Sequence, residues 1–145
     1  MSELLVKWIR LSVDGETCHR CRETGKEVSK AVEILSLILS PLNIKVTLEE
    51  VEITLNEFAQ NPLMSNEIWL NGRLLEDWLG AKTTRTPCCD VCGDEECRAL
   101  EIDGQLQEVV AAELIVKAGL IAASELLNES DCCPERTSRC VSCCE

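Results

Sequence analysis

The chain has 145 residues, enough for one domain with a hydrophobic core, and 46% hydrophobic with 28% charged residues indicates a globular protein. Its 26 acidic and 14 basic residues give a net charge of −12, which disfavours nucleic acid and anionic membranes as partners. No apolar run is long enough for a membrane helix, and the first 13 residues lack the pattern of a secretory signal. We therefore expect a cytoplasmic protein.

The cysteine content is high, with 11 cysteines in the chain. In the reducing cytoplasm structural disulfides are rare, so redox catalysis or metal binding is the better interpretation of these residues. The odd number also excludes complete pairing within one chain.

The first predicted elements are a strand and a helix. Residues 4–13 alternate in the manner of a largely buried strand. Residues 24–40 carry apolar side chains at helical spacing, and Thr24 with Glu27 predicts a capping box at the start of this helix. An earlier start with Thr17 as the cap is the alternative. The side chains predicted to face the core are Val28, Ala31, Val32, Leu35, Ile38, Leu39 and Leu42.

The middle of the chain predicts a second strand at 44–53, whose alternation slips at Glu49-Glu50 and so favours a bulge. Thr54 and Glu57 predict another capping box on a short helix that ends near residue 59. Asn71-Gly72, between apolar segments, predicts a type I′ hairpin because both residues tolerate a positive φ.

The last third begins with a composition break over residues 80–97. Asp103-Gly104 then suggests a second hairpin, and residues 111–127 form a predicted helix. We expect a domain over 1–128, with a Cys-rich insert at about 80–99, and a flexible Cys-rich tail over 129–145. The predicted core residues of the last helix are Leu114, Ile115, Ala118, Ile121, Ala122 and Leu126.

A pair of cysteines, Cys18 and Cys21, lies between the first strand and the first helix. The N–H groups at a helix start and its partial positive charge stabilise a thiolate. His19, Arg20 and Arg22 add positive charge that lowers a thiol pKa. We expect Cys18 to attack a disulfide and Cys21 to resolve the mixed disulfide. The alternative is half of a structural zinc site, which uses the same spacing.

This arrangement resembles a thioredoxin-like or glutaredoxin-like fold. Residues 65–72, Ser-Asn-Glu-Ile-Trp-Leu-Asn-Gly, are similar to the glutaredoxin segment that precedes and forms the sheet hairpin. That family carries a cis-proline six residues before the glycine, where this chain has Asn66. The resemblance implies an α/β thioredoxin-like fold, with a Cys-rich loop and an extra hairpin before the last helix. It also implies that Ser65 and Asn66 lie at a substrate-docking position.

A closer resemblance is to a prokaryotic thioredoxin-like family, the domain of unknown function 2703, over roughly residues 4–125. The matching features are residues 14–18 with Cys21, the Asn71-Gly72 hairpin with residues 75–76, the cysteines within 88–97, and residues 97–98 leading into 103–104. This resemblance implies a fold and a recurrence of cysteine, and it brings no established reaction.

Two further cysteine clusters suggest metal or disulfide chemistry. Cys88, Cys89, Cys92 and Cys97 can hold zinc or another thiophilic metal ion, form a disulfide, or stay reduced. No cofactor is certain from the sequence. The tail cysteines resemble the paired thiols of arsenic metallochaperones, and they can equally shuttle disulfides or have no role. They are Cys132, Cys133, Cys140, Cys143 and Cys144.

Two functions from different classes remain open at this level. The first is a thiol-disulfide oxidoreductase that acts on a protein or small-molecule thiol or disulfide, with the other clusters as a relay. The second is a non-enzymatic binding protein or metallochaperone for zinc, arsenite, mercury or copper(I). A single structural zinc is a third option.

Overall fold

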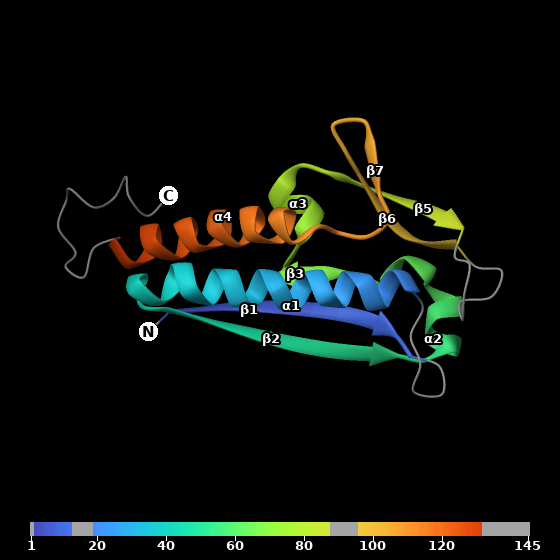
Figure 1. Ribbon diagram of the computed structural model, residues 1–145, viewed down its shortest axis with the longest axis horizontal. Coiled ribbons are helices and arrows are strands. Elements are labelled where there is room, and N and C mark those ends of the chain that lie inside the picture. The colour runs from blue at the N-terminus through green and yellow to red at the C-terminus, as the bar shows by residue number, and fades with distance from the viewer. Residues whose placement is uncertain (1, 13–18, 88–95, 132–145) are drawn as a thin grey trace.

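The computed structural model describes residues 2–12, 19–87 and 96–131, and they form a mixed α/β structure with two sheets and four helices. In Figure 1 the long helices α1 and α4 lie side by side along the larger sheet. No described helix is long and apolar enough to cross a membrane. The elements in chain order are β1 (Ser2–Leu11), α1 (His19–Leu39), β2 (Ile44–Ile53), α2 (Leu55–Gln60), β3 (Ile68–Leu70), β4 (Arg73–Leu74), α3 (Leu75–Leu79), β5 (Lys82–Pro87), β6 (Glu96–Ile102), β7 (Gln105–Gln107) and α4 (Ala112–Asp131).

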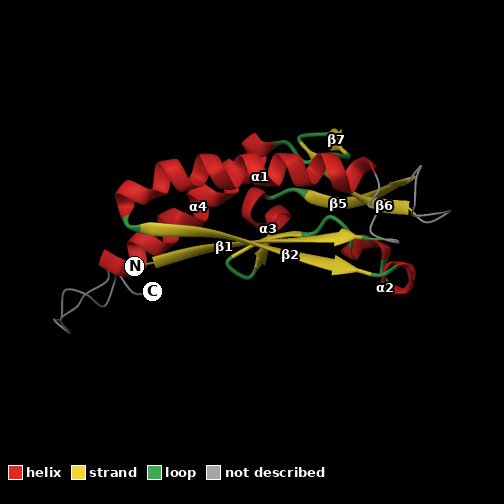
Figure 2. Cartoon of the chain, turned by 60° about the horizontal axis from the view of Figure 1, so that its bottom comes forward, coloured by secondary structure: helices red, strands yellow, loops and turns green. Residues whose placement is uncertain are grey.

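The larger sheet has the strand order β2-β1-β3-β4. The strands β1 and β2 are parallel and are connected through α1, whereas β3 runs antiparallel to both β1 and β4. The helix α1 covers one face of the parallel pair, as Figure 2 shows. This strand–helix–strand unit consists of the first three elements that the sequence predicted, and the helix provides the crossover that a parallel pair needs.

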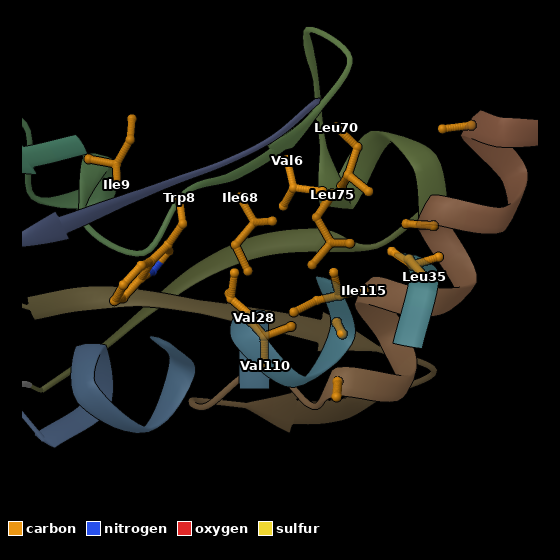
Figure 3. Close-up of a cluster of buried hydrophobic side chains, with 14 of the residues drawn as sticks. Val6, Trp8, Ile9, Val28, Leu35, Ile68, Leu70, Leu75, Val110 and Ile115 are labelled. Atoms are coloured by element: carbon orange, nitrogen blue, oxygen red, sulfur yellow. The ribbon is translucent and has the colours of Figure 1, made fainter. Parts of the chain in front are cut away.

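The hydrophobic core lies between this sheet and the two long helices. Along β1 the side chains alternate between faces, and Figure 3 shows Trp8 and Ile9 pointing to opposite sides of the strand. Val28 of α1, Ile68 of β3 and Ile115 of α4 meet in one buried cluster. The α1 and α4 helices approach closely at Gly119, where a Cβ would come within 2.6 Å of the Leu35 side chain.

Both predicted hairpins are confirmed. Asn71 and Gly72 have φ angles of 50° and 83° between β3 and β4. Asp103 and Gly104, at 52° and 78°, connect β6 to β7. The capping box of Thr54 and Glu57 is also present at the start of α2.

Of the two predicted starts of the first helix, the later one, at Thr24, is wrong, and the helix begins earlier. Residue 19 already belongs to α1, so Thr24 is buried inside the helix and caps nothing. The alternative cap, Thr17, lies outside the described residues. The helix α1 ends at Leu39, and a short 3-10 turn with Pro41 in its first positions follows, because proline disfavours continuation of an α-helix.

The expected bulge in the second strand is also wrong. All ten residues of β2 pair in unbroken register with β1. Because β2 is an edge strand, many of its side chains are only partly covered. The break in apolar alternation at Glu49-Glu50 therefore changes which side chains face solvent, and the backbone pairing stays intact.

The composition break contains strands that the sequence did not predict. Residues 82–87 form β5. The strand β6 pairs with β5 on one side and with β7 on the other, so the three strands make a second sheet. The last helix also continues beyond its predicted end to Asp131. Three predicted core side chains are exposed instead, namely Ile38, Leu42 and Ile121.

Candidate functional site

The start of α1 carries the described part of the cysteine pair. The strand β1 ends at Leu11, and Cys21 is the third residue of α1. Its side chain is completely buried. Cys18 lies outside the described residues, directly before the first residue of the helix. The first turn of a helix offers N–H groups without helical partners, together with a partial positive charge, and both favour anionic sulfur, whereas the complete burial of Cys21 disfavours a charged group.

Two of the predicted pKa-tuning residues, His19 and Arg22, are exposed on this first turn. The His19 ring nitrogen Nδ1 lies 3.5 Å from Nη2 of Arg22. Next along the helix, Lys26 donates to the Glu23 carboxylate at 3.1 Å, and this hydrogen bond lowers the pKa of Glu23. The helix start therefore presents cations to solvent, with one carboxylate held in its charged form among them.

The third predicted tuning residue, Arg20, points to the second sheet. It is buried, and its guanidinium donates to the carbonyl oxygens of Pro87 at 3.1 Å and Arg98 at 3.2 Å. It also forms an ion pair with Glu108 at 2.6 Å. These bonds hold the start of α1 against the ends of β5 and β6. A role of Arg20 in lowering a thiol pKa stays a prediction, and Glu108 partly neutralises the charge of this arginine.

The other described cysteine, Cys97, lies in β6 and is completely buried. It belongs to the same buried cluster as Cys21. Each cysteine is next in sequence to a residue of the Arg20–Arg98 hydrogen bond. The strands on either side of residues 88–95 end at Pro87 and begin at Glu96, which pair with each other. Cys88, Cys89 and Cys92 lie outside the described residues, as do the five tail cysteines.

The predicted docking residues Ser65 and Asn66 are buried beside the end of β1. The backbone N–H of Asn66 donates to the Ile9 carbonyl at 2.7 Å, and its side-chain oxygen accepts from the Trp8 indole at 3.1 Å. Asn66 has a φ of 63°, which asparagine tolerates better than most residues. Its peptide bond is trans, unlike that of the cis-proline at the corresponding position of the glutaredoxin-like family. The two hydrogen bonds described above fix Asn66 in place instead. Their role in docking stays a prediction.

The sequence did not indicate a buried ion network around Arg98. The guanidinium of this residue contacts carboxylates of Glu67, at 3.2 Å, and of Glu76. It also donates to the Leu63 carbonyl at 2.6 Å and to the Thr83 hydroxyl at 3.2 Å. No local pattern could have revealed these contacts, because the partners lie 15 to 35 residues away along the chain.

The described residues contain no group of three or more His, Cys, Asp or Glu side chains with the geometry of a metal site. Only two of the eleven cysteines belong to this part of the chain. Zinc or another thiophilic ion at Cys88, Cys89, Cys92 and Cys97 therefore stays a prediction, since three of these four residues lie outside the described ranges.

Comparison with known proteins places the chain in a family. No solved structure matches it. A protein of Archaeoglobus fulgidus, named only as an uncharacterized protein, is 66% identical over 113 residues, which cover 78% of this chain and 82% of the relative. Residues 4–119 match the family described as Domain of unknown function (DUF2703). The chain therefore belongs to the DUF2703 family.

Proposed function

We propose that this protein is a thiol-disulfide oxidoreductase of thioredoxin-like type, with Cys18 as the attacking residue and Cys21 as the resolving residue. The observation that carries the proposal is the buried Cys21 thiol in the first turn of α1, which follows a central parallel strand. A resolving thiol is best kept away from solvent, where outside disulfides cannot reach it, and best held at the electropositive end of a helix.

The proposed reaction proceeds in two exchanges. The Cys18 thiolate attacks one sulfur of a substrate disulfide, forms a mixed disulfide and releases the other substrate sulfur as a thiolate. The Cys21 thiolate then attacks the Cys18 sulfur, which forms the Cys18–Cys21 disulfide and releases the second substrate thiolate. Two electrons pass from the protein dithiol to the substrate, and an external dithiol reductant restores the reduced protein.

A thioredoxin-like fold is supported by the order of the elements around the cysteine pair. A parallel β1–α1–β2 unit is followed by an antiparallel pair, β3–β4, and by a helix, α4, that packs beside α1. Asn66 lies at the end of β1 where the resemblance implies a substrate-docking residue. The proposed substrate-docking surface is the region around Ser65 and Asn66.

The test compares two serine variants in the full chain. Cys18→Ser should abolish the reduction of insulin or glutathione disulfide by the dithiothreitol-coupled protein, because no attacking thiol remains. Cys21→Ser should also stop turnover, but it should accumulate one mixed disulfide with glutathione per chain, since attack proceeds and resolution does not. Mass spectrometry under non-reducing conditions detects this product, and circular dichroism checks that both variants fold.

Turnover retained by Cys18→Ser would overturn the proposal. So would stoichiometric zinc or another thiophilic metal in anaerobically purified protein that shows no turnover, and this result would favour the soft-metal binding protein instead. A titration of the Cys18 thiol at its ordinary pKa would count against a stabilised thiolate.

A further inference from the structure

A groove lies between α1 and the parallel strands β1 and β2, on the side of the sheet that α1 covers. It is an open depression of about 540 Å³, a volume within the range of small-molecule sites. Its walls are formed by Trp8 and Arg10 of β1, Glu50 of β2, and the side of α1 that carries Arg22, Gly25, Lys26, Ser29, Lys30 and Glu33.

The base of the groove is built by Trp8 and Gly25. The indole is almost completely buried, and a Cβ on Gly25 would lie only 2.5 Å from its Cη2 atom. Glycine thus lets the helix approach the ring more closely than any other residue would. The base is therefore rigid, since the indole N–H is also bound by Asn66.

Cations gather on this groove although the chain carries a net charge of −12. Arg22, Lys26 and Lys30 follow each other at intervals of four residues, so they form one row along α1. Arg10 reaches the same groove from β1, with its guanidinium carbon 5.9 Å from the centre of the Trp8 ring. Like charges at this spacing destabilise a helix, so the row costs stability unless an anion binds to it.

Nearby carboxylates neutralise only part of the positive charge along the groove. Arg10 pairs with Glu52, and Lys26 pairs with Glu23 at 3.1 Å. Neither Arg22 nor Lys30 has a carboxylate within ion-pair distance among the residues that the structure describes. In addition, the Nε atom of Arg10 is buried and has no hydrogen-bond acceptor among the described residues. A buried donor without an acceptor is rare and calls for one.

We infer that this groove binds a small organic anion, whose carboxylate or phosphate group lies among Arg10, Arg22 and Lys30. The two carboxylates in the walls of the groove, Glu33 and Glu50, restrict which anions can bind. They repel a polyanion, and they favour a ligand whose hydroxyl or ammonium groups can donate to them. A hydroxylated or aminated acid of metabolite size fits both requirements. This inference does not depend on the thiol chemistry proposed above.

The experiment measures binding of two probes to the full chain by isothermal titration calorimetry, with NMR of the Trp8 indole signal as the second readout. Glycerate carries one carboxylate and two hydroxyls, and glycerol 3-phosphate carries one phosphate and two hydroxyls, so the two probes differ chiefly in whether the anionic group is a carboxylate or a phosphate. Sodium chloride at equal ionic strength is the reference. We expect saturable binding of at least one probe together with a shift of the Trp8 signal.

The matched variants change two cations each. Arg22→Gln with Lys30→Gln should weaken binding at least tenfold, because both cations in the groove that lack carboxylate partners are removed. Lys82→Gln with Lys117→Gln removes the same charge from exposed positions on β5 and α4 and should leave the affinity within about twofold. Equal weakening by both pairs, or no saturable binding of either probe at millimolar concentration, would overturn the inference. The Cys18→Ser variant should bind as the parent does.

Discussion

Arg98 shows how a single buried side chain connects distant parts of the chain. Its guanidinium is only 7% exposed and meets two carboxylates, of Glu67 and Glu76, which are themselves 15% and 5% exposed. A charge in this environment is tolerated only because its partners are present, and removal of one partner leaves an imperfectly compensated charge in the interior. The network therefore binds β6 to the segments before β3 and in α3.

The Arg98 network predicts a large effect from a conservative substitution. Glu76→Gln keeps the size of the side chain but removes its charge, and we expect the free energy of unfolding to fall by about 3 kcal/mol. Glu125→Gln makes the same change in an exposed pair with Arg73, 3.7 Å apart, and should cost less than about 1 kcal/mol. Urea denaturation of both variants measures the difference. Equal losses of unfolding free energy in the two variants would show that the buried ion pair of Glu76 contributes no more to stability than the exposed one.

A second residue-scale prediction concerns Glu23, whose pKa is lowered chiefly by the hydrogen bond from Lys26. Lys26→Gln should raise the pKa of Glu23 towards its ordinary value, which a carbon-detected NMR titration can measure. Because the folded-state pKa is the lower one, this pair stabilises the fold above the ordinary pKa of glutamate, and the contribution disappears on acidification. An unchanged titration of Glu23 in Lys26→Gln would contradict the assigned cause. Lys117→Gln, on α4, provides the control.

At the scale of elements, patterns within one segment were predicted well, and patterns that depend on a neighbouring segment were not. Asn71-Gly72 and Asp103-Gly104 determined their hairpins because positive φ angles are a local requirement. The capping sequence at Thr24 also looked local, yet it lies inside α1, since packing of Thr24 and Val28 against the core outweighs the weak preference of a cap. Strand β5 was missed because its polar residues form a strand only by pairing with β6.

The contact between α1 and Trp8 predicts an unusual effect of Gly25→Ala. In most helices this change stabilises by about 1 kcal/mol, because alanine is the better helix former. Here the new methyl group would lie 2.5 Å from a buried ring, so we expect a net loss of about 1–3 kcal/mol. Ser29→Ala changes an exposed residue one turn further along the same helix and is the control, which should be neutral or slightly stabilising. Thermal denaturation that shows a stabilised Gly25→Ala would refute this contact.

At the scale of the whole molecule, the larger sheet and the second sheet are joined through the start of α1. Arg20 donates to residues at the ends of β5 and β6 and pairs with Glu108, 88 residues away in sequence. Of the candidate site, the sequence could predict that the cysteine pair lies between a strand and a helix, and the structure places Cys21 inside that helix. It could not predict that Cys97 belongs to the same hydrophobic core as Cys21, because this depends on how the second sheet packs against the rest of the molecule.

Arg20→Gln should therefore loosen the second sheet selectively. The variant loses the ion pair with Glu108 and the two hydrogen bonds to backbone carbonyls, so amide hydrogen exchange should become faster in β5 and β6. Exchange in β1 and β2 should change little, and these strands serve as the internal control. Uniform acceleration throughout the chain would indicate global destabilisation and contradict a local role for Arg20.

The long strand β2 has one neighbour, β1, among the described strands, so ten residues of backbone face outwards along the sheet margin. Such a margin invites strand addition from another chain. Three carboxylates, of Glu49, Glu50 and Glu52, stand along it. Two copies that met margin to margin would bring negative charges face to face, chiefly those of Glu49 and Glu50, since Glu52 pairs with Arg10, and the resulting repulsion disfavours such a contact.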